Sequence, residues 1–201
     1  MNTIVFFGGA FDPIHTGHLQ LCRAAYETVR PEQVILMPSM DSGHKHMRAS
    51  AEDRLQMCRL AAEPYPWLNV SDLEIRRKLC YTADTLRILS EQYQVCDFWL
   101  LLGEDQICSL PYWSRWQEFA PMSNVLAVHR PGCLPAITQL AEQRLLEAGC
   151  RVFWLDCERM PVSSTGIRRM LRSVPASEVE ELPPSVRAYI QRTQLYSGET
   201  C

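Results

Sequence analysis

Two histidines at positions 15 and 18 stand in a glycine-rich string whose residue types could bind phosphate. The string reads GGAFDPIHTGH over positions 8–18 and directly follows a short apolar run. Glycines let backbone N–H groups approach an anion, and a helix that starts here adds its partial positive charge. His15 and His18, three residues apart, would project side by side from the first helical turn. The string therefore predicts a phosphate cradle with two imidazoles beside it.

Two other interpretations of this string remain open. The glycines could form a plain turn in which the histidines cap a helix, or the histidines could belong to a zinc site, although no third ligand stands at a suitable spacing. The spacing is neither G-x-x-x-x-G-K-[ST] nor G-x-G-x-x-G. The fingerprints of a P-loop NTPase and of an NAD-binding dehydrogenase are therefore both missing.

A second string, VSSTGIR at positions 162–168, could also face an anion. Ser164 or Thr165 can cap a new helix whose first N–H groups stay available. Arg168, one turn further on, can place both arms of its guanidinium on the same phosphates. Taken alone, the string is more typical of a serine-capped helix with a solvated arginine.

The elements that must position these residues follow from an alternation of short apolar runs and longer helical patterns. Strands are predicted over 3–7, 33–37, 68–73, 97–102, 124–129 and 151–155, and helices over 16–29, 50–63, 82–93 and 135–148, with two short helices from about 164 and 184. This order predicts an α/β fold, a Rossmann-like open parallel sheet with helices on both faces and a small C-terminal helical part. We expect one domain over 1–201, with 163–196 as a C-terminal helical subregion.

Ligands of open parallel sheets bind outside the carboxyl ends of the strands. All five histidines of the chain fall in or beside the loops at these ends, or in the helix after the first loop: His15, His18, His44, His46 and His129. This clustering indicates a polar active site at that edge of the sheet.

Composition narrows the class of protein. The 201 residues carry a net charge of −3, which argues against a large nucleic-acid footprint, and no apolar run approaches the length that spans a bilayer. Nine cysteines form an odd set without a C-x-x-C pair, which is typical of reduced thiols. Together with a start that lacks a secretory signal, these features predict a soluble cytoplasmic protein that binds neither membrane nor nucleic acid.

The first string resembles the H-x-G-H signature of the nucleotidylyltransferases, and in its full form it resembles the nicotinate mononucleotide adenylyltransferase family. The second string is similar to the I-S-S-T-x-I-R motif of that family, with Gly166 as a departure. The resemblance implies that His15, His18 and Arg168 are catalytic and stabilise the transition state. It implies ATP binding by Gly8, Gly9, Ala10, Phe11, His15, His18, Gly103, Asp105, Ser164, Thr165 and Arg168.

Four further segments resemble ones that distinguish this family within its superfamily; the resemblance puts Gly103 and Asp105 near the ATP nucleoside and the remaining segments near the acceptor mononucleotide. They are EIRRKLCYTADTL at 74–86, GED at 103–105 followed by a tryptophan, HRPG at 129–132, and GHK at 43–45. Cys80 replaces the usual serine, and Gly43 stands where the family has proline. The resemblance implies acceptor binding by Lys45, Tyr81, Thr82, Thr85, Trp113 and Arg130.

The function implied is transfer of AMP from ATP to nicotinate mononucleotide, giving nicotinate adenine dinucleotide and pyrophosphate in NAD biosynthesis. Mg²⁺ would be carried by ATP rather than by a protein metal site. The alternatives are an adenylyltransferase for nicotinamide mononucleotide or another phosphorylated acceptor, and a non-catalytic nucleotide sensor. Oligomeric state stays open between a monomer and a homo-oligomer.

Overall fold

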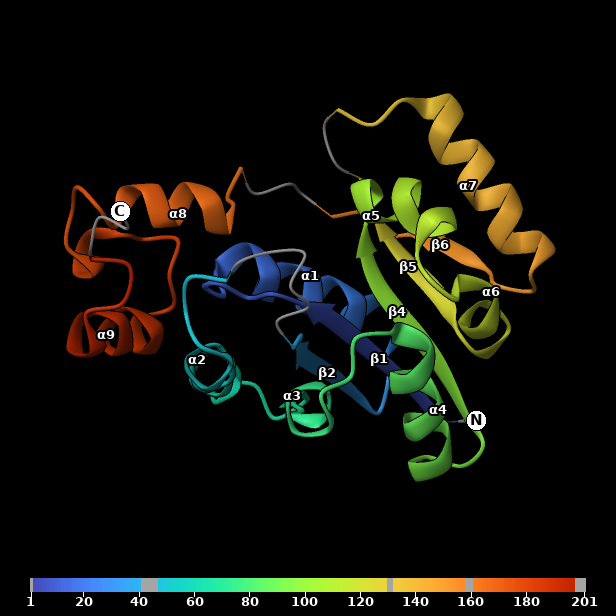
Figure 1. Cartoon of the computed structure of the whole chain (residues 1–201), viewed down its shortest axis with the longest axis horizontal. Coiled ribbons are helices and arrows are strands. Elements are labelled where there is room, and N and C mark those ends of the chain that lie inside the picture. Colours follow the sequence, from blue (N-terminus) through green and yellow to red (C-terminus); the bar gives the residue numbers. More distant parts are fainter. Residues whose placement is uncertain (1, 41–46, 130–131, 158–160, 198–201) are drawn as a thin grey trace.

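The computed structural model describes residues 2–40, 47–129, 132–157 and 161–197. Six parallel strands form one sheet in the order β3-β2-β1-β4-β5-β6 (Figure 1). The strands are β1 Asn2–Gly9, β2 Gln33–Pro38, β3 Leu68–Val70, β4 Cys96–Gly103, β5 Asn124–Val128 and β6 Val152–Trp154. From β1 the chain adds strands outward to β3 on one side, and from β4 it adds them outward to β6 on the other side. The switch point therefore lies between β1 and β4, and a ligand is expected at the carboxyl ends of these two strands. The predicted fold class is confirmed.

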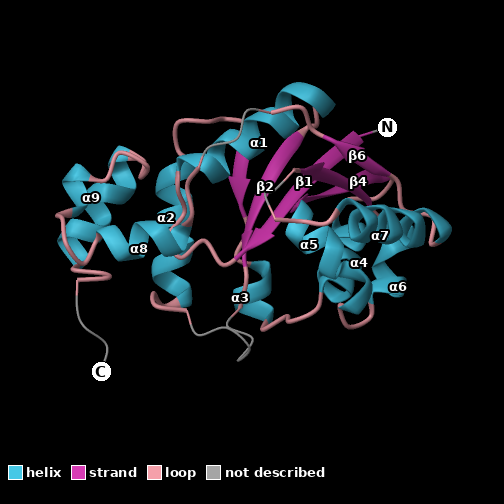
Figure 2. Ribbon diagram, turned by 90° about the horizontal axis from the view of Figure 1, so that it is seen from above, coloured by secondary structure: helices cyan, strands magenta, loops and turns pink. Residues whose placement is uncertain are grey.

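Helices cover both faces of the sheet because both faces of the strands are apolar. In β1, Val5 and Phe7 point to one face, and Ile4 and Phe6 point to the other. Figure 2 shows α1 on one side and α4 and α7 on the other. The first face is covered by α1 Thr16–Val29, α2 Ala51–Ala62, α8 Ser164–Met170 and α9 Pro184–Thr193; the second is covered by α4 Thr82–Gln92, α5 Glu104–Ser109 and α7 Pro135–Glu147.

The helices that the sequence did not predict are all short. They are α3 Leu73–Arg77, α5, α6 Trp116–Phe119, and three 3₁₀ turns at Leu110–Tyr112, Ala120–Met122 and Ala176–Glu178. The strand expected over 68–73 therefore ends early, at Val70. Its end has a local cause, because the Ser71 hydroxyl oxygen accepts a hydrogen bond from the Leu73 N–H at 3.2 Å and turns the chain into α3.

The C-terminal subregion packs onto the N-terminal part of the chain (Figures 1 and 2). Val179, Leu182, Val186 and Ile190 are buried in the same apolar cluster as β1 and α1. Polar contacts add to this packing: the Ser185 hydroxyl donates to the Leu60 carbonyl at 2.9 Å, and the Tyr189 hydroxyl donates to Asp53 at 2.7 Å. Residues far apart in the sequence thus meet at one end of the sheet.

Within the part of the chain that the structure describes, no helix combines the length and the apolar character needed to cross a membrane.

Candidate active site

The turn between β1 and α1 leaves its backbone open to a ligand. A Cβ atom at Gly8 would meet no atom within 4 Å, so this stretch of backbone faces open space. A Cβ at Gly9 would approach the Phe11 ring to 3.1 Å, and Phe11 itself has a φ of 47°, which few residues with side chains adopt. The turn is therefore tight at Gly9 and Phe11 and accessible at Gly8, as a phosphate cradle requires.

His15 and His18 cap the helix that follows through each other's ring. His15 Nδ1 accepts the His18 N–H at 3.3 Å, and His18 Nδ1 accepts the His15 N–H at 3.2 Å. Their rings stack with centroids 3.6 Å apart, and the Phe11 ring meets His18 edge-on at 5.1 Å. Because Nδ1 accepts in both neutral rings, this hydrogen-bond pattern assigns the proton to Nε2. Capping and phosphate binding are thus compatible, since capping uses Nδ1 and leaves the proton on Nε2.

The second string docks directly onto the first. The Ser164 hydroxyl donates to the Pro13 carbonyl at 3.0 Å, and Arg168 Nη1 donates to the Asp12 carbonyl at 2.6 Å. Arg168 Nη2 also donates to the Thr165 hydroxyl at 3.2 Å. These contacts bring together residues that are about 150 positions apart in the sequence.

The residue that caps α8 differs from the prediction. Ser163 is the N-cap, and its hydroxyl accepts the Gly166 N–H at 3.1 Å. The expectation that Ser164 or Thr165 would cap this helix is wrong, because Ser163 has the extended backbone that an N-cap needs and the next two residues are already helical. This shift leaves the Ser164 and Thr165 hydroxyls to contact Pro13 and Arg168.

A hollow of about 190 Å³ opens where the two strings meet. Its lining combines two imidazoles, a guanidinium and several hydroxyls with the start of a helix, and these groups suit a chain of phosphates. It is lined by Ala10, Asp12, His15, His18, Met47, Val162, Ser163, Ser164, Thr165 and Arg168. The structure thus brings both predicted phosphate-binding strings to a single site.

Sequence reasoning missed two buried charged residues at this hollow: Asp12 in its lining and Arg54 next to the lining residue Ala10. Arg54 of α2 has no exposed surface, and its guanidinium donates to the carbonyls of Ala10 and Ser39 at 2.8 Å each. Its bond to the Ala10 carbonyl fixes the backbone of the turn between β1 and α1, and its guanidinium adds a positive charge there. Asp12 is only 4% exposed, although it lies inside the first string. Nothing in the spacing marked either residue, because a single charge within a helix or loop is usually solvated.

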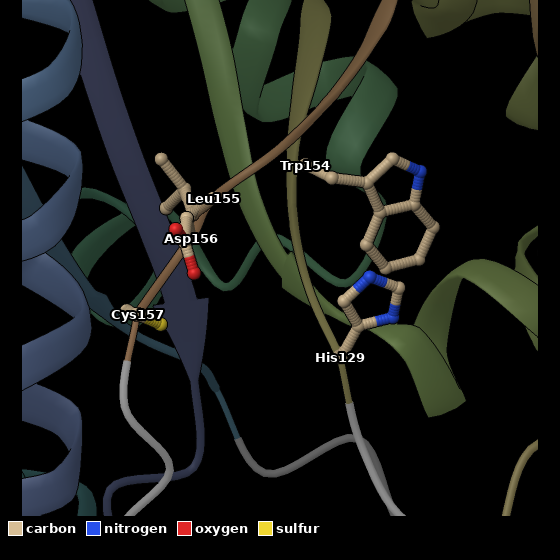
Figure 3. A pocket seen from close by; sticks show the side chains of 5 residues that line it. All are labelled: His129, Trp154, Leu155, Asp156 and Cys157. Atoms are coloured by element: carbon tan, nitrogen blue, oxygen red, sulfur yellow. The ribbon is translucent and has the colours of Figure 1, made fainter.

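A second hollow, of about 310 Å³, lies at the ends of β5 and β6 (Figure 3). The His129 ring stacks on the Trp154 indole at 4.1 Å, and Leu155, Asp156 and Cys157 complete the lining. Buried Glu104 holds His129 from behind, with 3.3 Å between Oε2 and Nδ1. Stacked rings beside a carboxylate can bind a planar heterocycle.

Residues that the resemblance connects with the ATP nucleoside stand one strand away from this hollow. Gly103 pairs with Val128, the neighbour of His129, and forms the N-cap of α5. Asp105 is exposed in the first turn of that helix. Both therefore lie at the carboxyl edge of the sheet, where a nucleotide would bind.

The predicted acceptor-binding residues gather around the start of α4. Tyr81 is its N-cap and is exposed, and Thr82 is its first residue. Thr85 is completely buried, and its hydroxyl donates to Glu74 at 2.9 Å. Burial raises the pKa of Glu74 to about 7, more strongly than the Thr85 hydrogen bond lowers it. Thr85 thus supports the wall behind Tyr81 and Thr82.

The segment that follows Trp113 is tied to the same helix through Arg115. Arg115 donates to Asp84 of α4 at 2.9 Å and to Glu118 at 2.7 Å, and its guanidinium lies 5.4 Å from the centre of the Tyr81 ring. The Trp113 indole is half-buried and donates to the Ser109 hydroxyl at 3.1 Å. Segments around 81–85 and 113–118 are therefore neighbours.

Two predicted residues, Lys45 and Arg130, lie outside the described residues, as do His44 and His46. Among the residues that the structure does describe, no group of three or more histidine, cysteine, aspartate or glutamate side chains could hold a metal ion.

Known proteins with similar sequences show to which family the chain belongs. The model of the cytidylyltransferase-like family matches residues 6–170, which include both strings. A probable nicotinate-nucleotide adenylyltransferase of Clostridium perfringens (strain SM101 / Type A) is 32% identical over 204 residues, which cover 99% of this chain and 100% of the relative. A probable nicotinate-nucleotide adenylyltransferase of Neisseria meningitidis serogroup C is 34% identical over 205 residues, or 98% of this chain and 99% of the relative. The chain belongs to the cytidylyltransferase-like family and, within it, to the nicotinate-nucleotide adenylyltransferases.

This membership confirms the family that the two strings resemble. The likeness extends over the whole length of these relatives and therefore includes the acceptor segments and the C-terminal helices. A solved structure of the nicotinic acid mononucleotide adenylyltransferase of Plasmodium falciparum, complexed with NaAD, has the same fold, with a TM-score of 0.81 over 99% of both chains at 17% identity.

Proposed function

We propose that the chain is a nucleotidyltransferase that moves AMP from ATP to nicotinate mononucleotide, forming nicotinate adenine dinucleotide and pyrophosphate in NAD biosynthesis. The observation that carries this proposal is the convergence of His15, His18 and Arg168 on one hollow at the carboxyl edge of the sheet. Full-length relatives with this name support the choice of acceptor. ATP would bind as its Mg²⁺ complex, in which the metal is part of the substrate.

The reaction needs positioning and charge stabilisation more than it needs a base. A phosphate oxygen of the mononucleotide, already ionised at pH 7, attacks the α-phosphorus of ATP; a new P–O bond forms while the bond to the β-phosphate breaks and pyrophosphate leaves. The Nε2–H groups of His15 and His18 and the guanidinium of Arg168 would donate to the oxygens on which charge builds up. The N-termini of α1 and α8 add their dipoles on the same side.

We place the acceptor between the start of α4 and Trp113. The exposed Tyr81 and half-buried Thr82 offer a ring and a hydroxyl, and Trp113 offers an indole for stacking on the pyridine. Lys45 and Arg130 complete the set as groups for the phosphate of the mononucleotide. A pocket of hydroxyl and N–H donors would satisfy a carboxylate and leave the NH₂ of an amide facing other donors.

The test is a side-by-side measurement of pyrophosphate release with the two mononucleotides at fixed Mg-ATP. We expect kcat/KM for the nicotinate form to exceed that for the nicotinamide form by at least about 10². Near-equal use of both would contradict the acid selectivity and keep the adenylyltransferase reaction. No pyrophosphate with any acceptor would favour a nucleotide sensor instead.

A further inference from the structure

Asp12 is a buried carboxylate at a site that should bind polyanions, and its charge needs an explanation. Its Oδ2 accepts the Arg48 N–H at 2.8 Å, and its Oδ1 accepts the Ala49 N–H at 3.1 Å and the Tyr196 hydroxyl at 2.8 Å. Three donors from two distant segments therefore converge on one carboxylate. With these donors in place, Asp12 is poorly suited to act as a base.

Asp12 accepts a hydrogen bond from Arg168 through its backbone carbonyl and not through its carboxylate. Arg168 Nη1 donates to the Asp12 backbone carbonyl at 2.6 Å, while its distance to Oδ2 is 3.8 Å, too long for a hydrogen bond. The carboxylate thus stays close to the guanidinium without forming a bidentate pair. If it did form such a pair, Arg168 would donate to Asp12 and have fewer N–H groups for a phosphate.

Tyr196 supplies the only side-chain hydroxyl that the structure gives Asp12 among the described residues. Its donor oxygen comes from a segment 184 positions away, after α9. Burial, with the nearby Asp12 carboxylate, raises the pKa of the Tyr196 hydroxyl, so this group remains a protonated donor at neutral pH. Hydrogen bonds from a hydroxyl to a carboxylate are among the strong ones in proteins.

We propose that Tyr196 is a positioning residue, which acts through Asp12 to keep the Arg168 guanidinium available to the phosphates of the substrate. Without the hydroxyl, Oδ1 keeps, among the described residues, only the Ala49 N–H as a donor, and the carboxylate can turn to close the 3.8 Å gap to Arg168. The segment after α9 is then a part of the active site that touches no substrate. This inference rests on the proposed function.

The chain offers a matched control for the test in Tyr189. Its hydroxyl also donates to an aspartate, Asp53, at 2.7 Å, and it belongs to the same C-terminal subregion. Asp53 lies in the first turn of α2 and does not line the hollow. Tyr189→Phe and Tyr196→Phe therefore remove the same kind of bond, one away from Arg168 and one beside it.

We expect Tyr196→Phe to lower kcat about tenfold, with KM for the acceptor changed less than about twofold, and Tyr189→Phe to keep kcat within about twofold of wild type. In an Arg168→Ala background, Tyr196→Phe should have little further effect, because the two changes act through one group. A tenfold loss that persists undiminished in that background would mean a merely structural role and overturn the inference.

Calorimetric titration with Mg-ATP gives a second readout that does not depend on turnover. We expect Tyr196→Phe to weaken ATP binding about fivefold and Tyr189→Phe to leave it within about twofold. If neither kcat nor ATP affinity separates the two variants, the inference is wrong. If the wild type binds ATP but transfers no AMP, the proposed function fails, and the affinities alone then decide on Tyr196.

Discussion

His15 and His18 can each serve two purposes, because the two nitrogens of an imidazole have different hydrogen-bonding roles. Nδ1 accepts from the backbone and fixes the first turn of α1, while Nε2 carries the proton that an anion can accept. An asparagine or serine could cap the helix equally well, but its shorter side chain would not carry a donor as far from the backbone as Nε2 of an imidazole. In the proposed mechanism, the chemistry and the local fold would therefore depend on the same pair of rings.

His18→Ala should lower kcat by about 10²–10³, because a donor to the developing charge is lost. The variant also loses the acceptor for the His15 N–H, which should cost about 1 kcal/mol of stability. Ser50→Ala is a suitable control, since Ser50 caps α2 by accepting the Asp53 N–H at 3.1 Å, away from the hollow. Steady-state kinetics of both variants check this; more than a third of wild-type kcat in His18→Ala would remove His18 from the chemistry.

Glu74 should make stability depend on pH. Its pKa is raised from 4.5 to about 7 in the folded protein, so the folded state holds a proton that the unfolded state has lost. Stability from this group is complete below pH 4.5 and is lost as pH rises through 7, by about 3 kcal/mol in all. We expect Glu74→Gln to gain about 2–3 kcal/mol relative to wild type between pH 5 and pH 8 in urea unfolding. A difference that does not change with pH would contradict the burial of an uncharged carboxyl.

At the level of elements, the first turn of α1 touches the segment that leads into α8. A Cβ at Gly17 would lie 2.6 Å from Val162 Cγ1 and 3.1 Å from His15 Nδ1. The glycine of the H-x-G-H string is therefore required by packing between two motifs, beyond any need for flexibility. This contact was not predictable from spacing, because Gly17 and Val162 are 145 positions apart.

Gly17→Ala should destabilise the protein by about 1–3 kcal/mol, since overpacking outweighs the gain in helix propensity. It should also lower kcat, because Val162 would push the string that carries Arg168. Val162→Ala in the same chain removes the clash, so the double variant should recover much of both losses. Additive losses, measured by urea unfolding and pyrophosphate release, would show that the contact is unimportant.

Long elements were predictable and most short ones were not, although α8, with seven residues, begins where a short helix was predicted. The predicted helix over 16–29 matches α1 at both ends, because its apolar positions repeat over several turns and Pro31 follows. By contrast, α5 has six residues and starts directly at the end of β4, so it offers no period to detect. At the start of α2, the Ser50 hydroxyl caps the helix, and the Asp53 carboxylate accepts from the hydroxyls of Ser50 and Tyr189.

The residues of the site also divide into those that the local sequence predicts and those that it does not. Histidines, glycines and Arg168 were found because their spacing carries chemistry, and the sheet topology then required them to meet at one edge. Asp12, Arg54 and Tyr196 act through contacts between segments far apart in the chain. Such contacts depend on tertiary packing, which no local pattern encodes.

For the molecule as a whole, the C-terminal subregion should unfold together with the sheet. Leu182 has no exposed surface and lies in the cluster that includes Val5 of β1. We expect Leu182→Ala to cost about 2–5 kcal/mol and to lower hydrogen-exchange protection in β1 as much as in α9. Leu146→Ala, at a 66% exposed position, should change stability by less than about 0.5 kcal/mol. Protection lost only in α8 and α9 would instead indicate a separate unit.

The bond between Asp12 and Tyr196 joins positions 184 residues apart. At about 5–20 residues per second, a ribosome needs roughly 10–40 s to travel between their codons. During this time β1 and α1 can fold. Arg168 either has not been synthesised or lies beside an Asp12 carboxylate that Tyr196 does not yet hold. Ribosome-stalled chains that lack residue 196 should therefore release little pyrophosphate, and full-rate release should begin only with longer chains. A nascent chain should thus reach its full catalytic rate only after Tyr196 has left the ribosome, however early its first strand folds.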